Sequence, residues 1–169
     1  MSSSRRETLW LVLRTVLFTV VVPATVVLYV PAGLAGSPTG TNAGLRLIGL
    51  VVAAAGLLLT GWCWVEFISR GRGTPAPWDP PRFLVRGGPY RFVRNPIYMG
   101  IVAVLFGETA FLGSAALLVW SLAVALLFHL AVVLYEEPGL KERFGVDYER
   151  YLAAVPRWVP RLRLPRSTE

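Results

Sequence analysis

Two short polar blocks, each joined to a long apolar run, carry the side chains of this chain that could do chemistry. The first block, residues 87–100, is basic and punctuated by prolines, and it leads directly into apolar sequence. The second block is Glu136-Glu137-Pro138, at the end of another apolar run. Arginines bind carboxylates and phosphates, whereas carboxylates bind cationic groups. The two blocks together could therefore hold a charged small molecule beside a lipid-soluble one.

The first block places several polar side chains around the start of an expected helix. Arg94 and Tyr98 are four residues apart, and Asn95 can cap the helix that follows it. A helix N-terminus beside an arginine is a suitable site for a carboxylate or a phosphate. The alternative, which the spacing leaves open, is that Tyr90, Arg91 and their neighbours are only interfacial tyrosines and snorkelling arginines.

The acidic block predicts a change of chain direction. The residue before a proline avoids helical geometry, so we expect a break at Glu137. Neighbouring residues on a helix point about 100° apart, so at most one of Glu136 and Glu137 can point fully into a pocket. The other can hold an arginine of the basic loop. A solvated, interfacial helix end is the alternative.

Three further polar residues lie within or beside apolar runs. Glu108 is a functional candidate as an intramembrane acid, although a nearby outer turn could bring it to water. His129 is seven residues before Glu136 and on the same face, but a lone histidine in a helix is more often structural. Glu66 can join the polar residues or pair with Arg70 at the i,i+4 spacing.

The elements that must position these residues are apolar helices. The chain has 169 residues, enough for a single domain (residues 1–169), and 54% of them are hydrophobic. Residues 15–45 and 47–65 carry no charge, and residues 95–135 carry only that of Glu108. Because a bilayer span needs about 20 mostly apolar residues, these runs predict transmembrane helices.

We therefore expect an all-α integral membrane protein with four transmembrane helices. The expected spans are residues 9–30, 45–68, 96–112 and 115–135. Gly113-Ser114 makes so short a turn that the last two spans must form a helical hairpin. Residues 69–95 form a basic cytoplasmic loop and residues 136–169 a cytoplasmic tail. In the second span, Gly49, Ala53, Ala55 and Gly56 offer a small-residue face for close packing.

The charge pattern fixes the expected orientation. The net charge is +7, but the basic residues gather in alternating loops, which is the positive-inside pattern and not a nucleic-acid surface. Both termini and the loop over residues 69–95 should be cytoplasmic, next to anionic lipid. Small size and arginine-rich, lysine-poor usage favour a bacterial inner membrane. Nucleic acid is not an expected partner.

The tail alternates apolar and charged residues at helical spacing. Gly145 should end one short helix and Asp147 should cap the next. Such a tail would lie on the membrane or fold back over the basic loop. Cys63 is the only cysteine, so no intrachain disulfide can form, and we expect no metal site.

The two polar blocks also resemble a known family. Gly88-Pro89-Tyr90, followed by Val-Arg-Asn-Pro-Ile-Tyr-Met-Gly over residues 93–100, is similar to the isoprenylcysteine carboxyl methyltransferases. That family is related to the membrane phospholipid methyltransferases. The second block also matches, through Glu136-Glu137, Phe144-Gly145 and Val155-Pro156-Arg157. The resemblance covers residues 87–160, close to half of the chain.

The resemblance implies an integral-membrane methyltransferase that uses S-adenosylmethionine. The family binds this cofactor between the inner ends of its last helices and the C-terminal segment. By position, the implied cofactor-binding residues are Tyr90, Arg94, Asn95, Pro96, Tyr98, Gly100, Glu136 and Glu137. The implied catalytic residues are Arg94, Glu137 and Arg157. Where the family commonly has histidine, Asn95 can keep a hydrogen bond but cannot titrate near neutrality.

The acceptor of the methyl group stays open at this point. A small or lipidic acceptor, with a carboxylate or an amine as its nucleophile, fits a site beside the bilayer. A carboxylate needs no general base, whereas an amine or a thiol does, with Glu137, Tyr148 or His129 as the candidates. Two other functions compete with methyl transfer. One is a membrane reductase of the same superfamily, and the other is a non-enzymatic scaffold or transport subunit.

Overall fold

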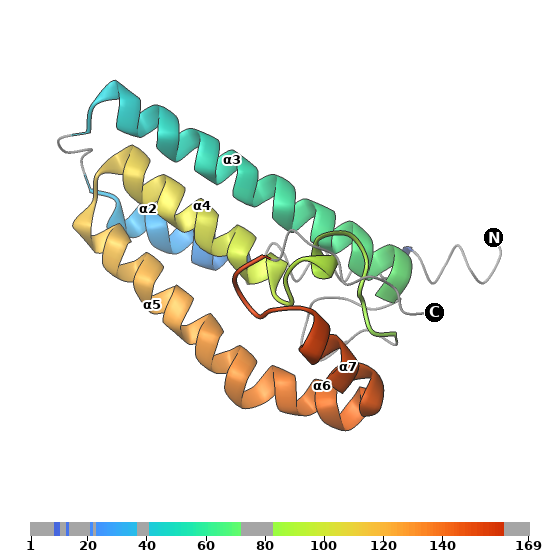
Figure 1. The fold of residues 1–169 in the computed structure, drawn as a ribbon. Coiled ribbons are helices and arrows are strands. Elements are labelled where there is room, and N and C mark those ends of the chain that lie inside the picture. The colour runs from blue at the N-terminus through green and yellow to red at the C-terminus, as the bar shows by residue number, and fades with distance from the viewer. Residues whose placement is uncertain are drawn as a thin grey trace.

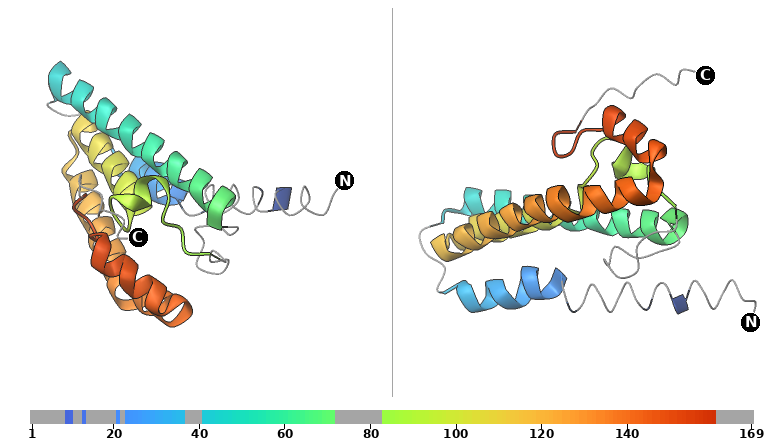
Figure 2. Two further views of the ribbon diagram at one scale, coloured as in Figure 1. Left: turned by 45° about the vertical axis from the view of Figure 1, so that its right-hand side comes forward. Right: turned by 90° about the horizontal axis from the view of Figure 1, so that it is seen from below.

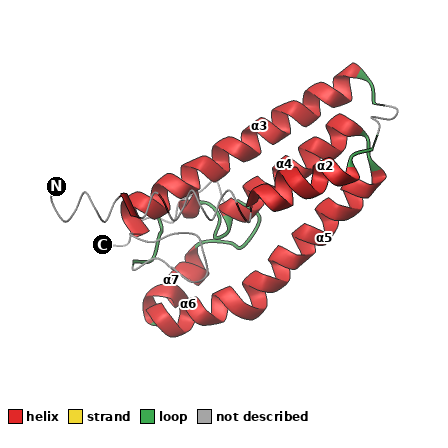
Figure 3. Ribbon diagram, turned by 180° about the vertical axis from the view of Figure 1, so that it is seen from behind, coloured by secondary structure: helices red, strands yellow, loops and turns green. Residues whose placement is uncertain are grey.

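A computed structural model describes residues 9, 10, 13, 21, 23–36, 41–71 and 83–160. These residues form helices with short connections, and no strand occurs among them (Figure 3). This part of the chain is therefore all-α, as the sequence indicates. Within the expected first span, residues 11, 12, 14–20 and 22 lie outside the described residues, as do parts of the basic loop and the end of the tail.

The helical elements follow one another with few intervening residues (Figure 1). In chain order they are the π-helical turn η1 (Thr25–Tyr29), α2 (Val30–Leu34), α3 (Ala43–Glu66), the π-helical turn η2 (Phe67–Gly71), the 3₁₀ turn η3 (Gly88–Arg91), α4 (Pro96–Leu112), α5 (Ala115–Ala131), the π-helical turn η4 (Val132–Glu136), α6 (Glu137–Phe144) and α7 (Val146–Ala154). The first helix therefore continues to Leu34, beyond its expected end at residue 30.

Local signals explain the bounds of the α4–α5 hairpin. Pro96 stands at the first position of α4, where its missing N–H costs nothing. Gly113 ends that helix with φ 69°, a left-handed conformation that favours glycine. The hydroxyl of Ser114 then accepts a hydrogen bond of 3.3 Å from the backbone N–H of Leu117 and caps α5.

The break expected at Glu137 is wrong. Glu137 has helical dihedral angles, φ −62° and ψ −43°, and α5 continues through η4 into α6. Pro138 has no backbone N–H, and its ring would crowd the carbonyl four residues before it in a regular α-helix. The wider π-helical turn at Val132–Glu136 lies where that crowding would occur. The helix absorbs the proline without ending.

Glycines set the contact between α3 and α4. A Cβ atom at Gly49 would lie 2.5 Å from the carbonyl oxygen of Gly107, and one at Gly56 would lie 2.5 Å from that of Gly100. The two pairs are seven residues apart on each helix, so they repeat after two turns along one antiparallel seam. Ala53 belongs to this face, but Ala55, which the sequence also suggested, is exposed.

The first helix and α5 pack on the other side of α4 (Figures 1 and 2). Val27 contacts a buried cluster formed by Ile101, Val104, Leu105 and Val124. The indole N–H of Trp120 donates a 3.0 Å hydrogen bond to the carbonyl of Val26, which ties the first helix to α5.

Large apolar side chains cover the outside of the helices. Leu58 of α3 is 76% exposed and Leu134 of η4 is 71% exposed. Two helical stretches, Ala43–Arg70 and Ala115–Phe144, are long and apolar enough to cross a membrane. The stretches Thr25–Leu34 and Pro96–Leu112 are apolar but shorter. Such an outer surface suits a lipid environment, because water-soluble monomers rarely expose large apolar patches.

The tail folds back over the basic loop. Gly145 separates α6 from α7 with φ 49°. Tyr148, Tyr151 and Val155 then form a buried cluster, against which Leu84 of the loop packs. Of the two expected arrangements, the structure has the folded-back one. Gly145, not Asp147, occupies the capping position of α7.

Candidate functional site

The start of α4 and the segment after α7 lie against each other. The backbone N–H of Arg94 donates a 2.9 Å hydrogen bond to the carbonyl of Pro156. The side-chain amide of Asn95 donates a 3.3 Å hydrogen bond to the carbonyl of Arg157. Asn95 therefore binds the returning tail and makes no side-chain cap on α4, contrary to the capping role expected from the sequence. These contacts bring two distant stretches of sequence, residues 94–95 and 156–157, to one place.

Glu137 lies between two arginines. Its Oε1 is 3.1 Å from Nη1 of Arg94, and its two oxygens accept hydrogen bonds of 2.7 and 2.8 Å from Nε and Nη2 of Arg157. The side chains of Arg94 and Glu137 are 11% and 15% exposed. The hydrogen bond to Glu137 raises the pKa of Arg157. Two cations so close keep the carboxylate ionised, so Glu137 is a poor proton acceptor.

Glu136 points toward a different partner. The hydroxyl of Tyr98 donates a hydrogen bond to Oε1 of Glu136, which joins α4 to η4. The Tyr98 ring also packs on Phe128, with 4.5 Å between the ring centroids. The two adjacent carboxylates thus take separate partners, as their helical spacing indicates. We call Arg94, Tyr98, Glu136, Glu137 and Arg157 the polar cluster.

The polar cluster has unused hydrogen-bonding capacity. Nε of Arg94 is buried and has no hydrogen-bond partner among the described residues. A buried donor without a partner is costly, typically by about 1–3 kcal/mol. A ligand with an anionic oxygen would remove that cost. The chemistry that suits the cluster is therefore binding of a small molecule with a negatively charged group.

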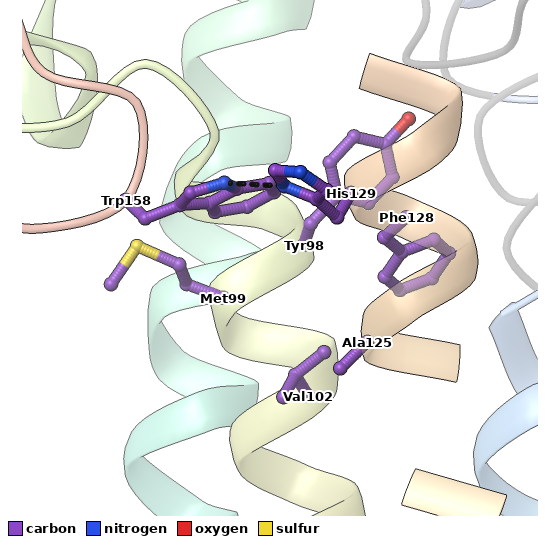
Figure 4. A pocket seen from close by; sticks show the side chains of 7 residues that line it. All are labelled: Tyr98, Met99, Val102, Ala125, Phe128, His129 and Trp158. Atoms are coloured by element: carbon purple, nitrogen blue, oxygen red, sulfur yellow. Dashed lines mark hydrogen bonds between the residues drawn. The ribbon is translucent and has the colours of Figure 1, made fainter. Parts of the chain in front are cut away.

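An apolar pocket lies beside the polar cluster (Figure 4). Its volume is about 220 Å³. The lining residues are Tyr98, Met99, Val102, Ala125, Phe128, His129 and Trp158. The indole N–H of Trp158 donates a 3.1 Å hydrogen bond to Nδ1 of His129. Tyr98 belongs to both the pocket and the cluster, so the two adjoin at this residue. We call this cavity the aromatic pocket.

Three residues that the family resemblance implied lie outside the polar cluster. The Tyr90 side chain packs against Cys63 and Phe67 of the second helix, where burial raises its pKa well above the usual value. Pro96 is fully buried at the start of α4. A Cβ atom at Gly100 would meet the hydroxyl of Thr60, so Gly100 faces α3. The structure gives these three packing roles, and any cofactor contact by them stays a prediction.

Two tyrosines of α7 are buried next to the loop that precedes α4. The hydroxyl of Tyr151 donates a 2.8 Å hydrogen bond to the carbonyl of Tyr90, so α7 holds the 3₁₀ turn η3 in place. Tyr148 is buried, and burial, with a smaller contribution from Glu137, raises its pKa to about 12. Tyr148 is therefore protonated near neutrality.

The three polar residues of the apolar runs lie at separate places, and none belongs to the polar cluster. They are Glu66, Glu108 and His129. Glu66 is buried and pairs with Arg70 at 3.0 Å, as the i,i+4 spacing predicts. Glu108, near the far end of α4, does not meet the polar cluster among the described contacts. His129 lines the aromatic pocket through its bond to Trp158. No group of three His, Cys, Asp or Glu side chains in the described part of the chain could hold a metal ion.

Sequence reasoning missed Trp158 as a site residue. The one available signal was its position directly after Arg157 in a segment that the family resemblance includes. Its partner His129 is 29 residues earlier, and no local pattern connects the two. The carbonyl oxygens of Pro156 and Arg157 were also missed, because backbone acceptors leave no signature in a sequence.

Comparison with known proteins gives one match. A family model described as phospholipid methyltransferase matches residues 45–147, more than half of the chain. The matched region begins in α3, includes α4, α5 and the acidic pair, and ends in the first turn of α7. No curated protein and no solved structure matches at a significant level.

Proposed function

Because the chain belongs to the phospholipid methyltransferase family, we propose that it uses S-adenosylmethionine to methylate a small or lipidic carboxylic acid at the membrane. The observation that carries this proposal is the polar cluster: buried Arg94 pairs with Glu137 and has an N–H without a partner among the described residues, while the adjacent Glu136 pairs with Tyr98. The family match favours methyl transfer over the reductase and scaffold functions that the sequence left open.

The polar cluster fits the amino-acid end of the cofactor. Arg94 would donate its free Nε–H to the cofactor carboxylate, which removes an unpaired buried donor. Glu136 would accept from the cofactor ammonium group, because Tyr98 uses only part of its hydrogen-bonding capacity. Glu137 would hold Arg94 and Arg157 in place without contacting the cofactor itself. When bound, S-adenosylmethionine supplies a methyl carbon on a positively charged sulfur.

The remaining work of the protein is alignment and exclusion of water. In an in-line displacement the acceptor lone pair forms the new bond to the methyl carbon while the carbon–sulfur electron pair returns to sulfur. Such a reaction gains most from proximity and orientation, which can lower the barrier by roughly 7–11 kcal/mol. The aromatic pocket, which shares Tyr98 with the polar cluster, would keep water from the acceptor.

Three observations favour a carboxylate over an amine as the acceptor. An amine must lose a proton, and each candidate base is unsuited to take it. Glu137 lies between two guanidinium groups, the pKa of Tyr148 is about 12, and Nδ1 of His129 already accepts from Trp158. An ionised carboxylate needs no base, and Arg157 could orient it.

The same proposal includes four membrane spans with cytoplasmic termini. The α4 helix has 17 residues and a length of about 26 Å, the short limit for a span. Arginines 86, 91, 94, 143, 150 and 157 lie in the loop, the polar cluster and the tail, which favours placing that end in the cytoplasm of a bacterial inner membrane.

Methyl transfer can be tested in vesicles made from total bacterial membrane lipid. Purified protein is incubated with methyl-tritiated S-adenosylmethionine, and label in the organic phase is counted before and after mild alkali. We expect lipid-soluble label that alkali releases as methanol, because a methyl ester is alkali-labile. Alkali-stable label would contradict the carboxylate acceptor. No label from a folded protein would contradict methyl transfer to a membrane lipid.

A matched pair of variants links this activity to the polar cluster. Glu136→Gln keeps an acceptor for the Tyr98 hydroxyl but removes the charge, so we expect at least a tenfold loss of label. Glu149→Gln changes an exposed carboxylate that pairs with Lys141 on the tail, and it should leave the label unchanged. Equal loss in both variants would mean that the effect is not specific to the site.

A further inference from the structure

The side chains that line the aromatic pocket suit a flat, apolar ring. Figure 4 shows the Trp158 indole and the His129 imidazole at one end, with Val102 and Ala125 at the other. Two further aromatic rings, those of Tyr98 and Phe128, form a side wall. Aromatic walls favour planar ligands, since stacked and edge-to-face ring pairs are worth about 0.5–1.5 kcal/mol beyond buried area.

Two polar groups of the pocket lining already have partners within the protein. The Tyr98 hydroxyl donates to Glu136, and the Trp158 N–H donates to His129. Few polar groups are left for a ligand inside the pocket, so a nucleobase, which has several donors and acceptors, would lose hydrogen bonds with water on entry. The pocket therefore suits an apolar part of the acceptor better than the adenine ring of the cofactor.

The size of the pocket limits what it can enclose. A cavity of roughly 150 Å³ lined by apolar side chains binds benzene. The aromatic pocket, at about 220 Å³, has about half as much space again. That volume suits a group of two fused rings or a similarly compact unsaturated group. Trp158 closes one end, and its place depends on the hydrogen bond to His129.

Arg157, the residue before Trp158, indicates that the charged end of the ligand is an anion. Arg157 directs Nε and Nη2 to Glu137, and its side chain remains 32% exposed. A guanidinium group has five N–H donors, so Arg157 keeps some for a second anion. A ring in the pocket could thus carry its carboxylate toward Arg157.

We propose that the aromatic pocket binds the flat ring of a cyclic carboxylic acid, and that Trp158, held by His129, sets the largest ring admitted. This inference rests on the proposed function only in naming that acid as the methyl acceptor. The ring site itself requires no cofactor, so it can be tested alone.

The test uses 2-naphthoate as the probe and measures its binding by calorimetry to protein in lipid nanodiscs, with empty discs subtracted. We expect saturable binding, at least tenfold tighter than that of octanoate, which has the charge without the ring. We also expect it to be at least tenfold tighter than 2-naphthylmethylamine, which has the ring with the opposite charge. Equal binding of all three probes would overturn the proposal.

Three variants of the pocket and one control variant locate the bound probe. Ala125→Phe fills the pocket and should abolish 2-naphthoate binding, whereas Trp62→Ala, an exposed tryptophan on α3, should leave it unchanged. Trp158→Ala should admit 9-anthroate, which the wild type excludes, and His129→Leu should act in the same direction. Unchanged 2-naphthoate binding in a folded Ala125→Phe variant would overturn the assignment to this pocket.

The outcome separates this inference from the proposed function. Both probe binding and the effects of the variants are measured without S-adenosylmethionine. Binding of 2-naphthoate in the pocket without methyl transfer would leave the ring site standing and overturn its assignment to the acceptor. Methyl transfer to lipid that Ala125→Phe does not alter would likewise overturn the assignment of the ring site to the acceptor, without contradicting methyl transfer itself.

Discussion

Two helix contacts of α4 are built in opposite ways. Against α3, backbone meets backbone through Gly49, Gly56, Gly100 and Gly107, with no room for a Cβ atom. At the start of α4, the contacts toward α5 and the returning tail are made by long polar and aromatic side chains around a cavity, whereas an aliphatic cluster fills the rest of the α4–α5 contact. One side of α4 is thus closed and uniform, and the other is open and chemically varied.

The difference separates support from function. A seam of glycines leaves no space for a ligand and no side chain to move, so it fixes the position of α4. Side-chain contacts can be replaced by contacts with a ligand, because a side chain can change its rotamer while the backbone stays in place. We conclude that α3 holds α4 rigid so that the opposite face can bind.

The largest effect is expected from a substitution that disrupts the glycine seam between α3 and α4. Gly56→Val places a branched side chain 2.5 Å from a backbone oxygen, so α3 and α4 must separate. We expect a loss of about 3 kcal/mol or more in the free energy of unfolding, as for severe overpacking. Thermal unfolding in detergent measures this change in the free energy of unfolding.

Gly61→Ala is the control, since nothing lies within 4 Å of a Cβ atom at that position. The free energy of unfolding of this variant should stay within about 1 kcal/mol of the wild-type value. Equal stability of both variants would contradict the close seam.

A smaller effect is expected from a substitution that detaches the tail from α4 and leaves the glycine seam intact. Glu137→Ala leaves two arginines without their shared carboxylate, and Arg94 is largely buried. We expect a loss of about 2–3 kcal/mol, somewhat below the usual cost of breaking a buried pair because Arg157 is partly exposed. Limited trypsin digestion should cut the tail at Arg150 or Arg157 faster than in the wild type.

The exposed pair on the tail supplies the control for that experiment. Glu149→Ala removes the partner of Lys141, but both side chains are more than half exposed. The pair should contribute less than about 0.5 kcal/mol, so the digestion rate should not change. Similar digestion of the Glu137→Ala and Glu149→Ala variants would mean that Glu137 does not hold the tail.

The smallest effect concerns one hydrogen bond between the tail and the loop. Tyr151→Phe leaves the buried carbonyl of Tyr90 without its donor, which should cost about 1–2 kcal/mol. Hydrogen exchange of the backbone amides around η3 should become faster. Tyr135→Phe, on a side chain that is 71% exposed, should change nothing. Unchanged exchange in the Tyr151→Phe variant would show that α7 does not fix η3.

The parts of the fold that local chemistry controls were predictable from the sequence. Pro96 and Gly113 mark the two ends of α4, and the structure begins and ends that helix at the expected residues. The spacing of Glu136 and Glu137 indicated different partners, and the resemblance to membrane methyltransferases is confirmed by the family match. Each of these depends on a few neighbouring residues or on a motif.

What could not be predicted depends on contacts between distant segments. The π-helical turn before Pro138 accommodates the proline in place of the expected break, and Glu137 in the continuing helix then pairs with the distant Arg94 and Arg157. The bond between Trp158 and His129 has no local signal. The motif containing Tyr90 and Gly100 did not distinguish residues that pack from residues that face the site.

The most direct test of the central claim is calorimetric binding of S-adenosylmethionine to the purified protein in lipid nanodiscs. We expect the wild type to bind with a dissociation constant in the range of about 1 μM to 1 mM that is usual for enzyme substrates. We expect at least tenfold weaker binding to Glu136→Gln and unchanged binding to Glu149→Gln. No binding by a folded wild type, or equal binding by the Glu136→Gln variant, would contradict the account.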